Sequence, residues 1–215
     1  MSNPEKKGGC GGCLGKGCLV LIVVAAIFVG IVFFSYQRFI QKARKYTAQT
    51  ATVIPVEKTN QEEYSALIKR MDAFKKAAPG SDAELFLTAH DLNTLIALDP
   101  GWSIASGKIH VLIDGGKVGL VSSIPLSAVP QLRERYLNGS LYFTPSIDNK
   151  VLHVNVQDIK INNHDLSKEY VKDIATGVQA NLSNRLLGDS VIGPVLIKAE
   201  TLKVENDALV LKSAK

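Results

Sequence analysis

The sequence predicts an α+β protein in which an N-terminal transmembrane helix precedes an antiparallel, curved sheet with two or three helices packed on one face. Three observations lead to this fold class. Residues 17–37 form one uncharged apolar run, segments of alternating polarity are joined by tight-turn signals, and other segments place apolar residues at helical spacing. The chain of 215 residues has 46% hydrophobic and 21% charged residues, a composition that excludes a wholly disordered protein.

The apolar run lies between Lys16 and Arg38. As a helix it would be about 31 Å long at about 1.5 Å per residue, which matches a bilayer core of about 30 Å. A cleaved signal peptide would have a shorter apolar stretch and a small-residue cleavage site at its end. Residues 17–37 have neither feature, so we expect an uncleaved signal anchor.

The basic residues on the two sides of this span are nearly equal in number, so they do not decide its orientation. The membrane-flanking basic residues are Lys16, Arg38, Lys42, Arg44 and Lys45. Long domains translocate largely regardless of charge, and all three cysteines precede or begin the span. Thiols kept in a reducing cytosol fit that distribution. We therefore expect a single-pass membrane protein with a cytoplasmic N-terminus and an extracytoplasmic C-terminal domain.

The leader, residues 1–16, is rich in Gly and Cys and is expected to be flexible. Cys10, Cys13 and Cys18 have no nearby His, whereas a structural zinc site uses four ligands, so no metal is expected. Lipidated thiols or an intermolecular site remain open alternatives. Within the span, Ala26 and Gly30 form a small-residue pair through which two copies of the chain could approach as a homodimer.

Residues 38–82 are predicted to form a juxtamembrane segment, in which the basic residues meet lipid head groups. The stretch from Thr59 to Glu62 reads as a capping box that opens an amphipathic helix. Its apolar stripe indicates packing on a neighbouring element, and a stalk or a partner-binding helix is the alternative. The stripe consists of Tyr64, Leu67, Ile68, Met71 and Phe74.

Residues 83–215 are predicted to form one extracytoplasmic α+β domain with a single antiparallel sheet. Turn signals at 114–116, 148–150 and 206–207 separate the strands, and a change of phase near Gln157 predicts a β-bulge. The expected elements are a strand at 83–87, a helix begun by Thr88–Asp91, strands at 108–113, 117–124, 140–147 and 151–161, a helix from Ser167, and strands at 195–205 and 208–212.

No pattern in the sequence points to catalysis, to a cofactor or to a metal. The four histidines are scattered, no nucleophile elbow or phosphate-binding loop is present, and no pair of carboxylates stands out by spacing. The charge of the domain is nearly balanced, so a nucleic-acid partner is not expected. An enzyme would need a pocket that gathers His90, Asp91 or His153 from distant parts of the chain.

Two loops carry candidate contacts for a membrane or a ligand. Trp102 stands beside Ile104 and either inserts into an apolar surface or closes one end of the core. Arg133, Arg135 and Tyr136 form a basic and aromatic turn, in which the arginines either hold an anion or pair with carboxylates.

The segment Leu87-Thr88-Ala-His-Asp-Leu92-Asn93-Thr-Leu95-Ile96 resembles a helix start in the YpmS-like uncharacterised bacterial membrane proteins. The turn at 136–139 and the Asn-rich turn at 161–163 are similar in style to that group. The resemblance covers roughly residues 83–212, and the helical stretch at 165–189 departs from it. It implies a single-pass, envelope-facing protein of unassigned activity and brings no catalytic residue with it.

Three functions remain open at this point. The leading hypothesis is a non-enzymatic, membrane-tethered domain that binds a lipid or another envelope component. The alternative is a scaffold or interaction subunit of a membrane complex with a protein partner, and the third is a hydrolase whose site the sequence does not display. In each case the lipid bilayer is an expected partner.

Overall fold

The computed structural model describes residues 29–30, 33–78, 81–162, 164–166 and 168–213. The chain divides into two compact units, Met1–Lys45 and Tyr46–Lys215. In the first unit, residues 29–30 and 33–45 are helical, and the Arg38 guanidinium lies 4.5 Å from the centre of the Phe34 ring. Most of the expected span at 17–37 lies outside the described residues. Within the described part of the chain, no helix combines the length and apolar character that crossing a membrane requires.

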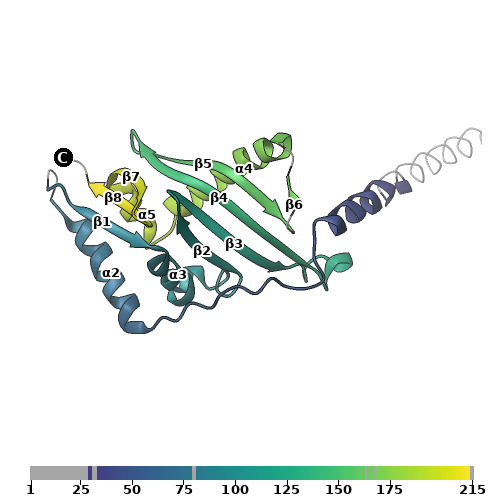
Figure 1. The fold of residues 1–215 in the computed structure, drawn as a ribbon, viewed down its shortest axis with the longest axis horizontal. Helices are drawn as coiled ribbons and strands as arrows, with labels where there is room; N and C mark the ends of the chain where they lie inside the picture. Colours follow the sequence, from purple (N-terminus) through teal and green to yellow (C-terminus); the bar gives the residue numbers. More distant parts are fainter. Residues whose placement is uncertain (1–28, 31–32, 79–80, 163, 167, 214–215) are drawn as a thin grey trace, which may run out of the picture. The chain divides into compact units, whose positions relative to one another are not determined.

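The second unit is an α+β structure with antiparallel sheets (Figure 1). The larger sheet has the strand order β2-β3-β4-β5-β6. Its strands are β2 (Ile109–Asp114), β3 (Lys117–Pro125), β4 (Tyr136–Asp148), β5 (Val151–Ile161) and β6 (His164–Asp165).

The turns of the larger sheet follow the sequence prediction. Gly115 and Gly116 adopt positive φ angles between β2 and β3, and Asn149 and Lys150 do so between β4 and β5. The register of β4 against β5 shifts between Tyr142 and Phe143, which leaves one extra residue, Gln157, on β5. The predicted bulge is confirmed.

A second sheet of order β1-β8-β7 corrects the prediction of a single sheet. It contains β1 (Glu84–Thr88), β7 (Ala199–Glu205) and β8 (Ala208–Ser213). Two helices, α4 (Lys168–Leu187) and α5 (Ile192–Lys198), separate β6 from β7 and carry the chain away from the first sheet. β8 then pairs with β1, so the first and the last named strands of this unit lie side by side.

The helix α5 corrects a second prediction, because residues 195–198 were expected to begin a strand. Ile192, Val195, Leu196 and Ala199 are buried, and their spacing is that of a helix face. A short run rich in β-branched residues does not distinguish a strand from a buried helix by composition alone. Burial against the core decides the conformation here.

The predicted amphipathic helix is α2 (Gln61–Lys76), and it packs on the domain through Leu67, Met71 and Phe74. Its N-cap is Asn60 rather than Thr59, because the Asn60 side chain accepts hydrogen bonds from the first-turn N–H groups. α2 belongs to the compact unit Tyr46–Lys215.

One apolar cluster runs through α2, both sheets, α3 (Ala89–Leu98) and α5. The expected cap of α3 is present, because the Thr88 hydroxyl and the Asp91 carboxylate accept from each other's backbone N–H groups. The 3-10 helices η1 (Pro100–Trp102) and η2 (Pro130–Leu132) lie in loops between these elements. The core therefore holds both sheets together in one unit.

Candidate functional site

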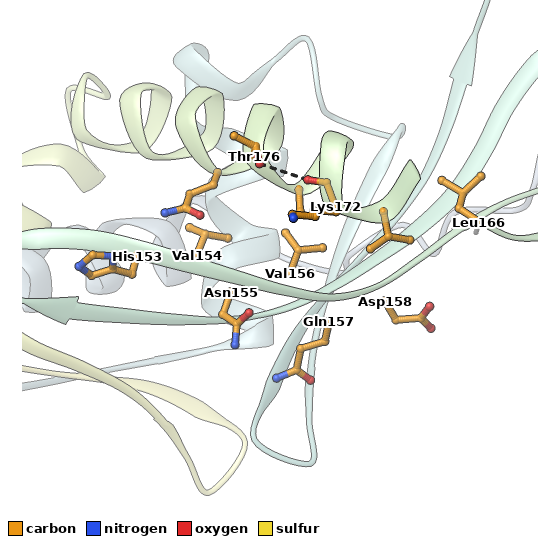
Figure 2. Close-up of a pocket in the computed structure, with 12 residues that line it drawn as sticks. His153, Val154, Asn155, Val156, Gln157, Asp158, Leu166, Lys172 and Thr176 are labelled. Atoms are coloured by element: carbon orange, nitrogen blue, oxygen red, sulfur yellow. Dashed lines mark hydrogen bonds between the residues drawn. The ribbon is translucent and has the colours of Figure 1, made fainter. Parts of the chain in front are cut away.

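A pocket of about 650 Å³ lies between β5 and the N-terminal part of α4 (Figure 2). Residues of β5 and α4 supply all of the lining except Leu166, which precedes α4. The lining consists of His153, Val154, Asn155, Val156, Gln157, Asp158, Leu166, Val171, Lys172, Ala175, Thr176 and Gln179. We call this site the α4–β5 pocket.

The floor of the α4–β5 pocket comes from the alternation of β5. Val154 is 2% exposed and Val156 is half-buried, and both point toward α4 (Figure 2). Asn155 and Gln157 point to the opposite face, where the Gln157 amide donates to the Thr144 hydroxyl at 2.8 Å. Successive side chains of a strand point to opposite faces, so the sequence of β5 gives one apolar and one polar side.

The wall of the pocket comes from α4, whose two halves differ. Its C-terminal half packs on the core through Leu182 and Leu186, and the Ser183 hydroxyl donates to the Leu152 carbonyl at 3.3 Å. The half over the pocket lines it with Val171, Lys172, Ala175, Thr176 and Gln179, of which Ala175 is the smallest.

Few charged groups line the α4–β5 pocket. Lys172 extends from α4 into the space above Val156 (Figure 2), and its ammonium has no ion-pair partner among the residues that the structure describes. Asp158 lies near Lys160, with 3.9 Å between carboxylate and ammonium. His153 stands five residues before Asp158 on β5, about 16 Å away at about 3.3 Å per residue. The His and the carboxylate therefore do not form an acid–base pair.

The other histidine considered for chemistry, His90, lies in a different cluster. Its Nδ1 atom is 2.7 Å from Glu57 and its Nε2 atom is 3.3 Å from Glu63. The hydrogen bond to Glu57, and to a smaller extent the one to Glu63, raises the pKa of His90. The pKa of Glu63 is lowered, mainly by the hydrogen bond that its carboxylate accepts from the Thr59 hydroxyl. The neighbouring Asp91 caps α3 and pairs with Arg70. The structure does not bring His90 or Asp91 into the lining of the α4–β5 pocket.

The structure separates the predicted pair Trp102 and Ile104. Trp102 is half-buried and packs against the core at η1, and its Nε1–H is buried without a hydrogen-bond partner in the described structure. Ile104 is 70% exposed. The position of Trp102 corresponds to the alternative in which it closes one end of the core. Ile104 lies on the surface.

The predicted turn at 133–136 fastens the start of the domain. The Arg135 guanidinium donates to the Thr47 hydroxyl at 2.6 Å and also to the Thr47 carbonyl, and Tyr136 exchanges backbone hydrogen bonds with Ala48. Arg133 is exposed. The guanidinium of Arg135, which was considered as an anion-binding group, thus donates to Thr47 of the same chain.

The predicted membrane-flanking residues fall partly in the described structure. Arg38, Lys42, Arg44 and Lys45 lie on the helical residues 33–45. A Cβ added at Gly30 would meet no atom within 4 Å among those described. Of the residues named in the sequence analysis, five lie outside the described part of the chain: Lys16, Ala26, Cys10, Cys13 and Cys18.

Sequence reasoning missed the α4–β5 pocket, although it expected a strand at 151–161 and a helix from Ser167. Side-chain size along the helix gives no signal for it, because the sequence has large residues at 170, 171 and 174 as well as leucines at 182 and 186.

We compared the chain with models of protein families, with curated proteins and with solved structures, and none of the three gives a match.

Proposed function

We propose that this protein is a membrane-tethered, extracytoplasmic binding domain that holds the apolar chain of a lipid-like amphiphile in the α4–β5 pocket. The observation that carries the proposal is the set of half-buried apolar side chains, Val156 on β5 with Val171 and Ala175 on α4, around a space that the helix does not fill. The volume of about 650 Å³ falls in the range of about 300–1,000 Å³ that small-molecule sites occupy.

Burial of methylene groups supplies the binding energy in this proposal. Each CH₂ moved from water into apolar surroundings contributes about 0.8 kcal/mol, or roughly a fourfold gain in affinity. Val156, Leu166, Val171 and Ala175 are half-buried and offer an apolar surface for such groups. Affinity should therefore rise with chain length until the pocket is filled.

The tether in this proposal is the apolar run 17–37, with the N-terminus in the cytoplasm. The length and the absence of charge in that run support it. A domain held beside a bilayer meets lipid at a high effective concentration, so the pocket would be occupied even if its affinity for lipid were weak.

Binding without catalysis is part of the same proposal. Its support is the arrangement of the polar groups at the pocket, since His153 and Asp158 project from well-separated positions on one strand. General acid–base catalysis needs groups within hydrogen-bond reach of one reacting atom.

Photo-crosslinking of the full chain in nonionic detergent tests the proposal. The probe is a sixteen-carbon alcohol with a diazirine in its chain, and adducts are mapped by peptide mass spectrometry. Adducts are expected in 151–158 and 166–179, while adducts in 17–37 report partition into the micelle. Ala175→Phe fills the pocket. It should remove the adducts in 151–158 and 166–179 and leave those in 17–37.

Ala180→Phe is the matched control, because Ala180 is an exposed residue of the same helix outside the pocket lining. It should leave the adducts at 151–158 unchanged. Equal labelling of β5 in wild type and Ala175→Phe would overturn the proposal, as would labelling confined to 17–37. Val156→Asn, which makes the floor polar, provides a second variant with the same expected loss.

A further inference from the structure

We propose that the α4–β5 pocket selects amphiphiles with a carboxylate head group, that is long-chain fatty acids, and that Lys172 is the residue that recognises the head. This inference rests on the proposed function and adds the chemical class of the ligand. It starts from a charged side chain that enters a pocket with an apolar floor.

Lys172 lies on α4 and extends into the space between the helix and β5 (Figure 2). Its backbone carbonyl accepts a hydrogen bond from the Thr176 hydroxyl at 3.1 Å. No ion pair engages its ammonium among the described residues, whereas the nearby Lys160 has two carboxylates within 4.0 Å. The positive charge of Lys172 is thus available to a ligand.

The remaining lining residues favour a head with a single negative charge. Among the residues whose side chains the structure describes, Lys172 is the only lysine or arginine that lines the pocket, and Asp158 on β5 adds a negative group. A phosphate monoester carries about −1.5 to −2 charge, which one ammonium does not neutralise, and its bidentate recognition uses arginine, which the described lining lacks. One ammonium beside an apolar floor fits one carboxylate on an alkyl chain better.

The expected size of the effect follows from the exposure of Lys172. The residue is exposed, so its ion pair with a ligand is screened by water, and a preference of about fivefold over an uncharged head is expected. Loss of the charge should abolish this preference and leave the binding of the alkyl chain itself in place.

Competition against the diazirine alcohol tests the inference with the full chain in nonionic detergent at pH 8.5. Palmitate, hexadecanol and hexadecyl phosphate compete for adducts at 151–158, and adducts at 17–37 correct for partition into the micelle. In wild type, palmitate should compete at about one fifth of the hexadecanol concentration. In Lys172→Gln the two should compete equally, while Lys172→Arg should keep the preference.

Lys203→Gln is the matched control, because Lys203 is an exposed lysine of β7 outside the pocket lining, and it should behave as wild type. Equal competition by palmitate and hexadecanol in wild type overturns the inference but leaves the proposed function intact. A preference that persists in Lys172→Gln also overturns it, and stronger competition by hexadecyl phosphate overturns the carboxylate assignment. Absence of any adduct at 151–158 overturns the proposed function and the inference together.

Discussion

The side-chain amide of Asn93 on α3 forms two hydrogen bonds with the backbone of Val111 on β2. Its nitrogen donates to the Val111 carbonyl and its oxygen accepts from the Val111 N–H, both at 2.8 Å. Asn93 is 4% exposed, so the pair is shielded from water. An amide is one of the few side chains that can satisfy the donor and the acceptor of one peptide residue together. This pair joins a helix to the larger sheet.

Replacing Asn93 with Ala should destabilise the domain by about 3 kcal/mol, because it leaves a buried N–H and a buried carbonyl without partners. The midpoint of urea unfolding, followed by circular dichroism, measures the loss. Asn181→Ala serves as the control, since Asn181 is exposed on α4 and bonds only within its own helix. Equal midpoints for wild type and Asn93→Ala would contradict the role assigned to the pair.

Two glycines should respond to Ala in opposite directions. A Cβ at Gly193 would lie 2.4 Å from the Leu187 carbonyl oxygen, so Gly193→Ala must displace α5 from the end of α4 and should cost about 1–3 kcal/mol. A Cβ at Gly177 meets nothing within 4 Å among the described atoms, and Gly177→Ala should stabilise α4 by about 0.5–1 kcal/mol. Thermal unfolding of both variants checks the signs. A stabilised Gly193→Ala protein would show that α5 is free to move.

Arg135 should control whether residues 46–52 stay on the domain. Arg135→Ala removes the hydrogen bonds to Thr47 and should increase protease cleavage in this segment several-fold while the core stays folded. Lys at position 135 should not restore protection, because one ammonium does not reproduce the fork of the guanidinium. The exposed Arg133, replaced by Ala, is the control. Unchanged cleavage in Arg135→Ala would refute the anchoring role.

His90 should make the stability of the domain depend on pH. Its raised pKa means that the folded state binds the proton more tightly than the unfolded state, whose pKa is about 6.5. The stabilisation is therefore full below that value and is lost as the pH rises through the pKa of folded His90. On the acid side, the lowered pKa of Glu63 removes stability as the pH falls through its folded value.

Thermal midpoints test that dependence when they are measured from below the pKa of folded Glu63 to above the pKa of folded His90. Wild type should lose stability toward alkaline pH more steeply than His90→Gln, which has no proton to release. His164→Gln should follow wild type, because the exposed His164 lies on β6, away from the two glutamates. Parallel curves for wild type and His90→Gln would contradict the assignment.

Local patterns in the sequence predicted much of the larger sheet. The glycines at 115 and 116 and the residues at 149–150 occupy the turns as expected, because left-handed backbone is restricted to few residue types. The bulge at Gln157 was visible as a change in the phase of apolar residues. The cap of α3 was visible at Thr88 and Asp91. Each of these features depends on neighbours in the chain.

The features that the sequence did not predict depend on distant contacts. The pairing of β1 with β8 joins strands that are far apart in the sequence, and no turn between them records it. Residues 195–198 became helix through burial against the core. The α4–β5 pocket lies between a helix and a strand that only the fold brings opposite each other, so no local pattern records it.

Hydrogen–deuterium exchange of the full chain, with and without palmitate in nonionic detergent, tests the proposed binding of an alkyl chain most directly. We expect slower exchange in peptides of β5 and of α4 between residues 168 and 180, no change in β2 and β3, and loss of the effect in Ala175→Phe. Exchange in β5 and α4 that palmitate leaves unchanged, at concentrations that saturate the micelle, would contradict it.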